Sequence, residues 1–194
     1  MDMYLIRHTT PAIEDGICYG HTDVPLADSF EVELTAVVAR LPDSFHRVYT
    51  SPLSRCARLA ERLVATRCIS DARLMELDFG AWEGRPWDDI DRAELDAWAA
   101  DIAGYACPGG ESYSQLYRRV SRFCAELERE LDRPDQGQCP CAIVAHGGSL
   151  RAMLARWMNW SPEQSLRYPI QYGAVSALTL DAGQAVMLEP AGRL

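Results

Sequence analysis

Two histidines of this chain each follow a short apolar run. His8 comes after the run 3–6, and His146 comes after the run 142–145. A neutral imidazole can attack phosphorus as a nucleophile, and a second one can stabilise the charge that develops in the transition state. Either histidine alone is more often an ordinary polar residue at the end of a strand. The chemistry therefore depends on the groups that accompany the two.

Arginines and glycine amides accompany both histidines. Arg7 precedes His8 directly, and Gly147 follows His146. Arg55 falls in the first turn of a predicted helix. Guanidinium groups offer forked donors that match phosphate oxygens, and amides at the start of a helix add donors and a favourable dipole. If the strand ends meet, these residues predict a cationic site for a phosphoryl group.

One carboxylate completes the set of candidate residues. Glu76 stands near a turn, with Asp78 and Glu83 as nearby alternatives. A carboxylic acid can protonate a leaving oxygen and then, as carboxylate, activate water. No second carboxylate stands at ligand spacing from the histidines, so we expect no metal. A metal-dependent phosphatase stays open as an alternative, because two histidines are present.

Alternating strands and helices predict the fold. Apolar runs predict strands at 3–6, 48–50, 73–77, 142–145, 174–180 and 185–188, and helical spacing predicts helices at 30–40, 52–64, 88–100, 112–131 and 149–159. Ser51 and Pro52 suit the N-cap and the first position of the second helix. This order predicts a three-layer α/β/α sandwich with a mainly parallel sheet, whose ligands bind beyond the carboxyl ends of the strands.

The chain reads as one domain over residues 1–194, with an excursion off the sheet at 81–111. That excursion holds Trp82, Trp87 and Trp98, many acidic residues and several glycines. We interpret the tryptophans as the core of this segment, which we expect to cover a site like a cap. Ser112 to Gln115 forms a predicted capping box, and 134–137 a predicted turn.

Composition narrows the setting of the protein. The chain has 194 residues, is 48% hydrophobic and carries a net charge of −9. This charge argues against nucleic acid or an anionic membrane as partner. No apolar run approaches the ~20 residues that span a bilayer, and no secretory signal is evident, so we expect a cytoplasmic protein. Seven scattered cysteines are expected to be free thiols. The oligomeric state is left open.

Five segments, in this order, resemble the histidine phosphatase superfamily, which is also called phosphoglycerate mutase-like. They are Leu5–His8, Thr50–Ala57, Glu76–Gly84, Pro108–Ser112 and Val144–Gly148. The resemblance implies the phosphoglycerate mutase-like fold and a small phosphorylated metabolite as substrate. It implies no metal and no organic cofactor for phosphatase activity.

The same resemblance implies roles for individual residues. His8 would be the phosphorylated nucleophile, and Glu76 would be the proton donor. Arg7, Arg55 and His146 would bind the phosphoryl group, with Gly147 beside them.

The chain departs from the commoner family motif at Thr9, where glycine is usual. We expect its hydroxyl to donate to the phosphate. The threonine form looks like a branch similar to the α-ribazole-5′-phosphate phosphatases of cobalamin synthesis, and so does the segment 16–26. Gly20 and His21 of that segment are candidate substrate-binding residues, although His21 fits a loop-capping role equally well.

The leading hypothesis is thus a phosphomonoesterase that acts through a phosphohistidine. A phosphoglycerate mutase is the enzymatic alternative, and a non-catalytic module that binds a phosphorylated ligand is the alternative of another class. Three further arginines, Arg58, Arg118 and Arg119, are expected to be solvated on helix surfaces.

Overall fold

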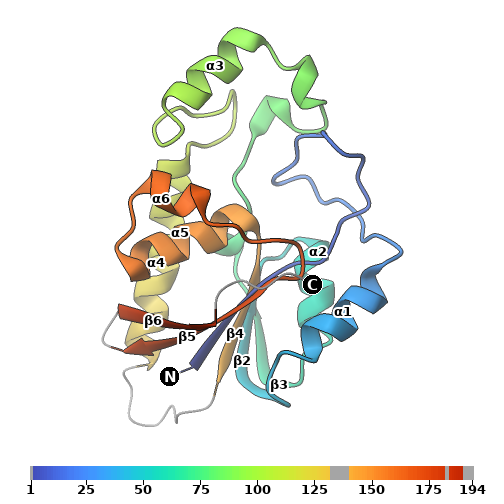
Figure 1. Ribbon diagram of the computed structural model, residues 1–194, viewed down its shortest axis with the longest axis vertical. Helices are drawn as coiled ribbons and strands as arrows, with labels where there is room; N and C mark the ends of the chain where they lie inside the picture. Colours follow the sequence, from blue (N-terminus) through green and yellow to red (C-terminus); the bar gives the residue numbers. More distant parts are fainter. Residues whose placement is uncertain (1, 132–139, 182–183, 190–194) are drawn as a thin grey trace.

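A six-stranded sheet forms the centre of the computed structural model, which describes residues 2–131, 140–181 and 184–189 (Figure 1). The strands follow the order β3-β2-β4-β1-β5-β6. β3, β2, β4 and β1 are parallel to one another, whereas β5 is antiparallel to both of its neighbours, β1 and β6. Their bounds are β1 Asp2–Arg7, β2 Phe45–Thr50, β3 Ala65–Ser70, β4 Cys141–Ala145, β5 Val175–Asp181 and β6 Gln184–Glu189.

Helices cover both faces of the sheet and complete the predicted three layers. α1 (Phe30–Val38) and α2 (Ser54–Ala60) lie on one face, and α4 (Tyr113–Leu131), α5 (Gly147–Met158) and α6 (Pro162–Arg167) lie on the other (Figure 1). Each face has its own cluster of buried side chains, because successive residues of a strand point to opposite faces. The predicted α/β sandwich with a mainly parallel sheet is confirmed. None of the described helices is long and apolar enough to span a bilayer.

The central strand β4 sets the position of the site. All five of its residues are buried, which is why the run Cys-Ala-Ile-Val-Ala is continuously apolar. β4 lies between β1 and β2 and is parallel to both, with Arg7 opposite Ala145 and Thr50 opposite Val144. The residues that follow these three strands therefore emerge at one edge of the sheet.

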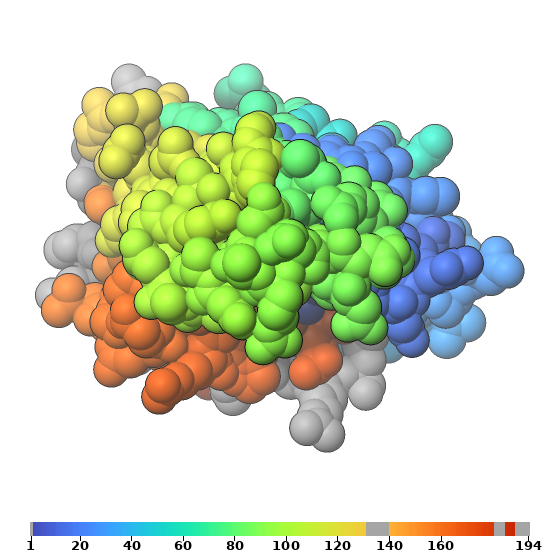
Figure 2. Space-filling model, turned by 90° about the horizontal axis from the view of Figure 1, so that it is seen from above, coloured from blue at the N-terminus to red at the C-terminus, as the bar shows by residue number. Residues whose placement is uncertain are grey.

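The segment between β3 and α4 projects beyond that edge (Figure 1). It contains the 3-10 turns η2 (Gly80–Trp82) and η3 (Trp87–Asp89) and the helix α3 (Arg92–Ala100). Trp82 is buried at its centre and packs against Trp87 and Trp98, so the tryptophans form a local core. Seen from above, this green to yellow-green segment covers much of the face (Figure 2).

The strand predicted at 73–77 is wrong. Residues Ala72–Leu74 form a 3-10 turn (η1), and the stretch up to Phe79 has no regular structure. The missed strand is β3, an edge strand with one neighbour and mostly exposed side chains. Because an edge strand needs little apolar surface, its sequence lacks the pattern of a buried strand.

The start of α2 also differs from the prediction. The helix begins at Ser54, so Ser51 and Pro52 precede it and are not its N-cap and first residue. The hydroxyl of Ser51 instead lies 2.8 Å from Nε2 of His146. The helix ends at Ala60, and Val64, predicted on the buried face, is 68% exposed.

Other boundaries agree with the prediction to within a few residues. The predicted capping box is confirmed, because Ser112 and Gln115 exchange backbone-to-side-chain hydrogen bonds of 2.7 and 3.3 Å. The six cysteines among the described residues are free thiols. Cys139 and the predicted turn at 134–137 lie outside the described residues.

The backbone around Gly80 yields a prediction about stability. Gly80 has φ +55°, and a Cβ there would lie 2.3 Å from the carbonyl oxygen of Pro108. Gly84 also has positive φ (+80°), but no atom of the described residues lies within 4 Å of a Cβ there. We expect Gly84→Ala to cost about 1 kcal/mol of unfolding free energy from backbone strain alone. Gly80→Ala should cost about 2 kcal/mol more, because main chain must move.

Urea unfolding of the two variants and the wild type measures this difference. Equal losses in the two variants would contradict a tight approach between residues 78–80 and 108–110.

Candidate active site

The carboxyl ends of β1, β2 and β4 open into a cavity of about 200 Å³. His8 and His146 lie side by side, with ring centroids 5.1 Å apart. Five residues predicted from the sequence line the cavity together with side chains from the loops above. The full lining consists of Arg7, His8, Ile17, Tyr19, Arg55, Glu76, Phe79, Trp87, His146 and Tyr172.

His8 is 2% exposed, and a backbone carbonyl group of the next residue fixes its ring. Its Nδ1 lies 2.7 Å from the carbonyl oxygen of Thr9, which can only accept a hydrogen bond. Nδ1 therefore carries a proton. Burial, and then the charges of Arg7 and Arg55, hold the pKa of His8 well below its usual value. The ring is neutral, and Nε2 keeps a free lone pair, as a nucleophile requires.

His146 is completely buried and is also neutral. Its Nδ1 accepts a hydrogen bond of 3.2 Å from Nε of Arg55, so Nε2 bears the proton and donates to the Ser51 hydroxyl. Burial, followed by the neighbouring His8 and the arginines, lowers its pKa well below the usual value. The sulfur of Cys56 lies 3.4 Å from Nε2, and burial raises the pKa of that thiol, so it is protonated.

Backbone carbonyls anchor the buried guanidinium of Arg55. Its Nη atoms donate to the carbonyls of Thr22 (2.9 Å) and Gly20 (2.6 Å), which ties the loop 9–26 to α2. Gly20 is buried where the loop 9–26 meets the stretch 75–79, and a Cβ there would lie 1.9 Å from the carbonyl oxygen of Leu77.

Arg7 is held from the opposite side of the site. Its Nη1 donates to the carbonyl of Ile170 (2.6 Å), and the guanidinium carbon lies 4.0 Å from the centre of the Tyr172 ring. Its buried Nε has no hydrogen-bond partner among the described residues. Among the residues that the structure describes, no carboxylate forms an ion pair with Arg7 or Arg55. The arginines are thus available to an anion.

Glu76 contributes the carboxylate of the cavity. One of its oxygens accepts from the backbone N–H of Gly148 (3.0 Å), at the start of α5, and the other from Leu77 (2.9 Å). These bonds aim the carboxyl group at the site. Gly147 is buried beside Arg7, and a Cβ there would meet the guanidinium at 3.4 Å.

The remaining predicted residues lie beside the cavity rather than in its lining. Thr9 is fully buried, and its hydroxyl has no partner in the described structure. His21 is a third exposed, and its Nδ1 lies 3.6 Å from the carboxylate of Asp78. The carboxylate of Glu83 binds the backbone N–H groups of His21 (2.8 Å) and Thr22 (2.6 Å), so this candidate acid supports the loop.

Sequence reasoning missed the aromatic part of the lining. The hydroxyl groups of Tyr19 and Tyr172 lie 2.5 Å apart, which joins the loop 9–26 to the segment before β5. Phe79 and Trp87 pack edge to face nearby (5.5 Å). Phe79 lies in the family segment Glu76–Gly84 and Trp87 lies in the excursion 81–111, whereas the sequence contains no signal that pairs Tyr19 with Tyr172.

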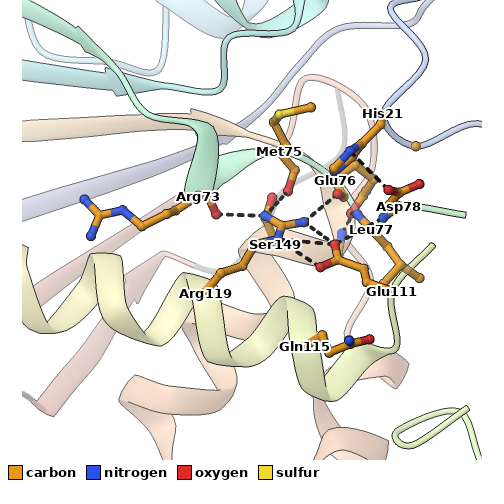
Figure 3. Close-up of polar contacts among 12 residues, drawn as sticks. His21, Arg73, Met75, Glu76, Leu77, Asp78, Glu111, Gln115, Arg119 and Ser149 are labelled. Atoms are coloured by element: carbon orange, nitrogen blue, oxygen red, sulfur yellow. Dashed lines mark hydrogen bonds and ion pairs between the residues drawn. The ribbon is translucent and has the colours of Figure 1, made fainter. Parts of the chain in front are cut away.

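The prediction that Arg119 is solvated is wrong. Its side chain is only 20% exposed and reaches from α4 to the carboxylate of Glu111 and to the backbone next to Glu76 (Figure 3). Arg118, the preceding residue, is exposed as expected. Among the described residues, no three His, Cys, Asp or Glu side chains are grouped as a metal site.

Comparison with known proteins identifies the family. The model of the histidine phosphatase superfamily (branch 1) matches residues 3–191. The chain belongs to this superfamily. It is 29% identical over 189 residues to the adenosylcobalamin/alpha-ribazole phosphatase of Escherichia coli K12, covering 93% of this chain and 91% of that one. It is 30% identical over 156 residues to a 2,3-bisphosphoglycerate-dependent phosphoglycerate mutase of Azorhizobium caulinodans (74% and 72%).

Solved structures agree with the family assignment. The alpha-ribazole phosphatase of Shigella flexneri superposes with a TM-score of 0.85 at 26% identity, covering 99% of this chain and 96% of that one. The phosphoglycerate mutase-like fold is therefore confirmed. Family and neighbours together support an enzyme of the histidine phosphatase type.

The two neutral histidines make stability depend on pH. Their folded-state pKa values lie below the unfolded value near 6.5, so in mild acid the unfolded chain binds protons that the folded protein does not. The free energy of unfolding should fall between pH 7.5 and 5.5, by about 1.4 kcal/mol for each histidine. Over the same pH range, the free energy of unfolding of His8→Asn should fall by about 1.4 kcal/mol less than that of the wild type, because one of the two histidines is gone.

Urea unfolding at both pH values, in buffer without phosphate, measures these losses. A His8→Asn variant as sensitive to pH as the wild type would contradict a neutral, buried His8.

Proposed function

We propose that the protein is a phosphomonoesterase that hydrolyses a small phosphorylated metabolite through phospho-His8. The observation that carries this proposal is the state of His8. It is neutral, its Nδ1 proton is fixed on a carbonyl, and it lies in a cavity with two guanidiniums that have no carboxylate partner in the described structure. A phosphoryl dianion fits this combination of charge and nucleophile.

The proposed reaction has two steps. In the first, the lone pair on Nε2 of His8 forms a bond to phosphorus while the bond to the leaving oxygen breaks, and Glu76 gives that oxygen a proton. In the second, the Glu76 carboxylate takes a proton from water, the water oxygen bonds to phosphorus, and the P–N bond breaks. Inorganic phosphate then leaves.

The surrounding groups stabilise the charge that moves in both steps. Arg7 and Arg55 bind phosphoryl oxygens with their forked donors, and the neutral His146 ring stands 5.1 Å from His8. Thr9 is proposed to turn its buried, unpartnered hydroxyl toward the bound phosphate. No metal or organic cofactor is needed for either step. Gly20 and His21 support the substrate pocket from the segment 16–26, and Gly147 supports it from the fifth family segment.

We infer that the substrate is α-ribazole 5′-phosphate or a close analogue, in cobalamin biosynthesis. Relatives named as alpha-ribazole phosphatases align over more than nine-tenths of the chain. The aromatic side chains of the lining, among them Tyr19, Trp87 and Tyr172, offer planar surfaces to a flat leaving group.

We also propose one domain over residues 1–194, in which 81–111 acts as a cap over the site. The segment lies beyond the sheet edge and covers much of the face that is seen from above, which supports the proposal (Figure 1 and Figure 2). A cytoplasmic location fits the free thiols of the described cysteines.

The nucleophile can be tested by trapping the intermediate. Rapid quench of the wild type with a 32P-labelled substrate should give an acid-labile, base-stable label on the protein. His8→Asn should give no label and should turn over about 10⁴-fold more slowly or worse, because both ring nitrogens of the other cavity histidine, His146, are already hydrogen-bonded to Arg55 and Ser51. Full activity of the variant, or phosphate binding by the wild type without turnover, would contradict the proposal; the second result would indicate a binding module.

The substrate can be tested with a panel of phosphate monoesters. We expect kcat/KM for α-ribazole 5′-phosphate to exceed that for 3-phosphoglycerate and for sugar phosphates by about 100-fold, since a flat base adds contact with the aromatic lining. Activity should persist in chelator. Mutase turnover of phosphoglycerate well above phosphate release would favour the alternative seen in the Azorhizobium relative.

A further inference from the structure

The proposed proton donor lies on a stretch of chain without helix or strand. Residues 75–79, which include Glu76, run between η1 and η2 with no ladder of backbone hydrogen bonds. A carboxylate on such a stretch needs some other support if it is to stay within reach of a leaving oxygen. In this protein the support comes from helix α4, which lies beside the stretch (Figure 3).

Arg119 of α4 provides most of that support. Its Nη1 donates to the carbonyls of Arg73 (2.9 Å) and Met75 (2.7 Å), and its Nη2 donates to the carbonyl of Glu76 itself (2.6 Å). The Nε and Nη2 groups also bind the carboxylate of Glu111. These contacts occupy all five N–H donors of the guanidinium.

Glu111 extends the support to the other side of Glu76. One of its carboxylate oxygens accepts from the backbone N–H of Asp78 (3.1 Å), and its own backbone N–H donates to the Asp78 carbonyl (2.9 Å). The Arg119–Glu111 pair therefore fixes the main chain before, at and after Glu76. Neither side chain lines the cavity, so neither can touch the reacting atoms.

We propose that Arg119, held by Glu111, is a positioning residue that keeps the Glu76 carboxyl group at the leaving-group oxygen. The inference rests on the proposed function, because it matters only if Glu76 donates a proton there. A lysine cannot replace the arginine fully, since one ammonium offers three donors in place of a planar fork of five.

Substrates that differ in their need for a proton test this role. p-Nitrophenyl phosphate and benzyl phosphate both carry one aromatic ring. p-Nitrophenolate leaves without protonation, whereas the benzyl alkoxide needs an acid. The measured quantity is kcat/KM, which reports formation of the phosphoenzyme and not its later hydrolysis. The useful number is the ratio of kcat/KM for the two substrates.

We expect Arg119→Met to lower kcat/KM for benzyl phosphate about 100-fold and for p-nitrophenyl phosphate less than about 5-fold. Glu76→Gln should show the same selectivity with a larger loss. Arg119→Lys should recover part of the ratio. Glu111→Gln, a milder change, should shift the ratio in the same direction and serves if Arg119→Met does not fold.

Arg156→Met is the matched control. Arg156 makes a comparable two-pronged ion pair with Glu128 (3.1 and 2.7 Å) and is similarly half-buried, but it lies at the far end of α5. It should lower the thermal stability, as Arg119→Met does, and leave the ratio unchanged. A ratio unchanged in Arg119→Met, Arg119→Lys and Glu111→Gln while it changes in Glu76→Gln would overturn the proposal and leave the proposed function intact.

Two further outcomes separate the inference from the function beneath it. A ratio that Glu76→Gln does not change would overturn the donor role of Glu76 and this inference together, while phospho-His8 could still be trapped. Absence of phosphate release from both substrates and from α-ribazole 5′-phosphate by the wild type would overturn the proposed function itself.

Discussion

Buried positive charge without a protein counter-ion is the constraint on which this structure depends. Arg55 is completely buried and Arg7 is partly buried, yet no described carboxylate pairs with either, in a chain with a net charge of −9. Burial of an unpaired charge costs free energy, and a neighbouring cation would raise the cost further. The pKa values of His8 and His146 are low first because the rings are buried and then because of the neighbouring charges in the same site. Glu76 is the one acid in the described lining of the cavity, and it forms no ion pair with either arginine. An incoming phosphate dianion would supply the negative charge that the two guanidiniums lack.

Backbone carbonyls take the place of carboxylates around these arginines. Arg55 binds carbonyls of the loop 9–26, and Arg7 binds one before β5. Arg119 binds three carbonyls around Glu76 in addition to the carboxylate of Glu111. Buried carbonyls need donors, and irregular segments cannot obtain them from strands or helices. These hydrogen bonds therefore have two effects. The carbonyl oxygens replace part of the water that a buried guanidinium loses, and the loops around the site are held in one conformation.

The parts predicted from the sequence are those whose signal is local. The strands at 3–6 and 142–145 were predictable because a buried parallel strand is apolar along its whole length, and the polar residue that ends each run becomes part of the site. β3 escaped prediction because an edge strand carries little apolar surface. Arg119 was wrongly predicted to be solvated because three of its partners are backbone carbonyls of an irregular segment. Every residue has such a carbonyl, so the sequence does not show which of them will bind an arginine. Tyr19 and Tyr172 are 153 positions apart in the sequence, so no local sequence pattern predicts their contact.

The position of β4 in the sheet has a consequence for how this protein folds during its synthesis on the ribosome. This strand lies between β1 and β2, although 90 residues (51–140) separate it from β2 in the chain and more separate it from β1. Neighbouring strands that are distant in sequence pair slowly, because a long loop must close first. While the ribosome is still making the middle of the protein, the nascent chain holds the two arginine-bearing segments but has no strand to join them. The sheet and the anion site must therefore arise together, late in synthesis, and a chain released before β4 has emerged would expose two apolar strand edges with nothing between them.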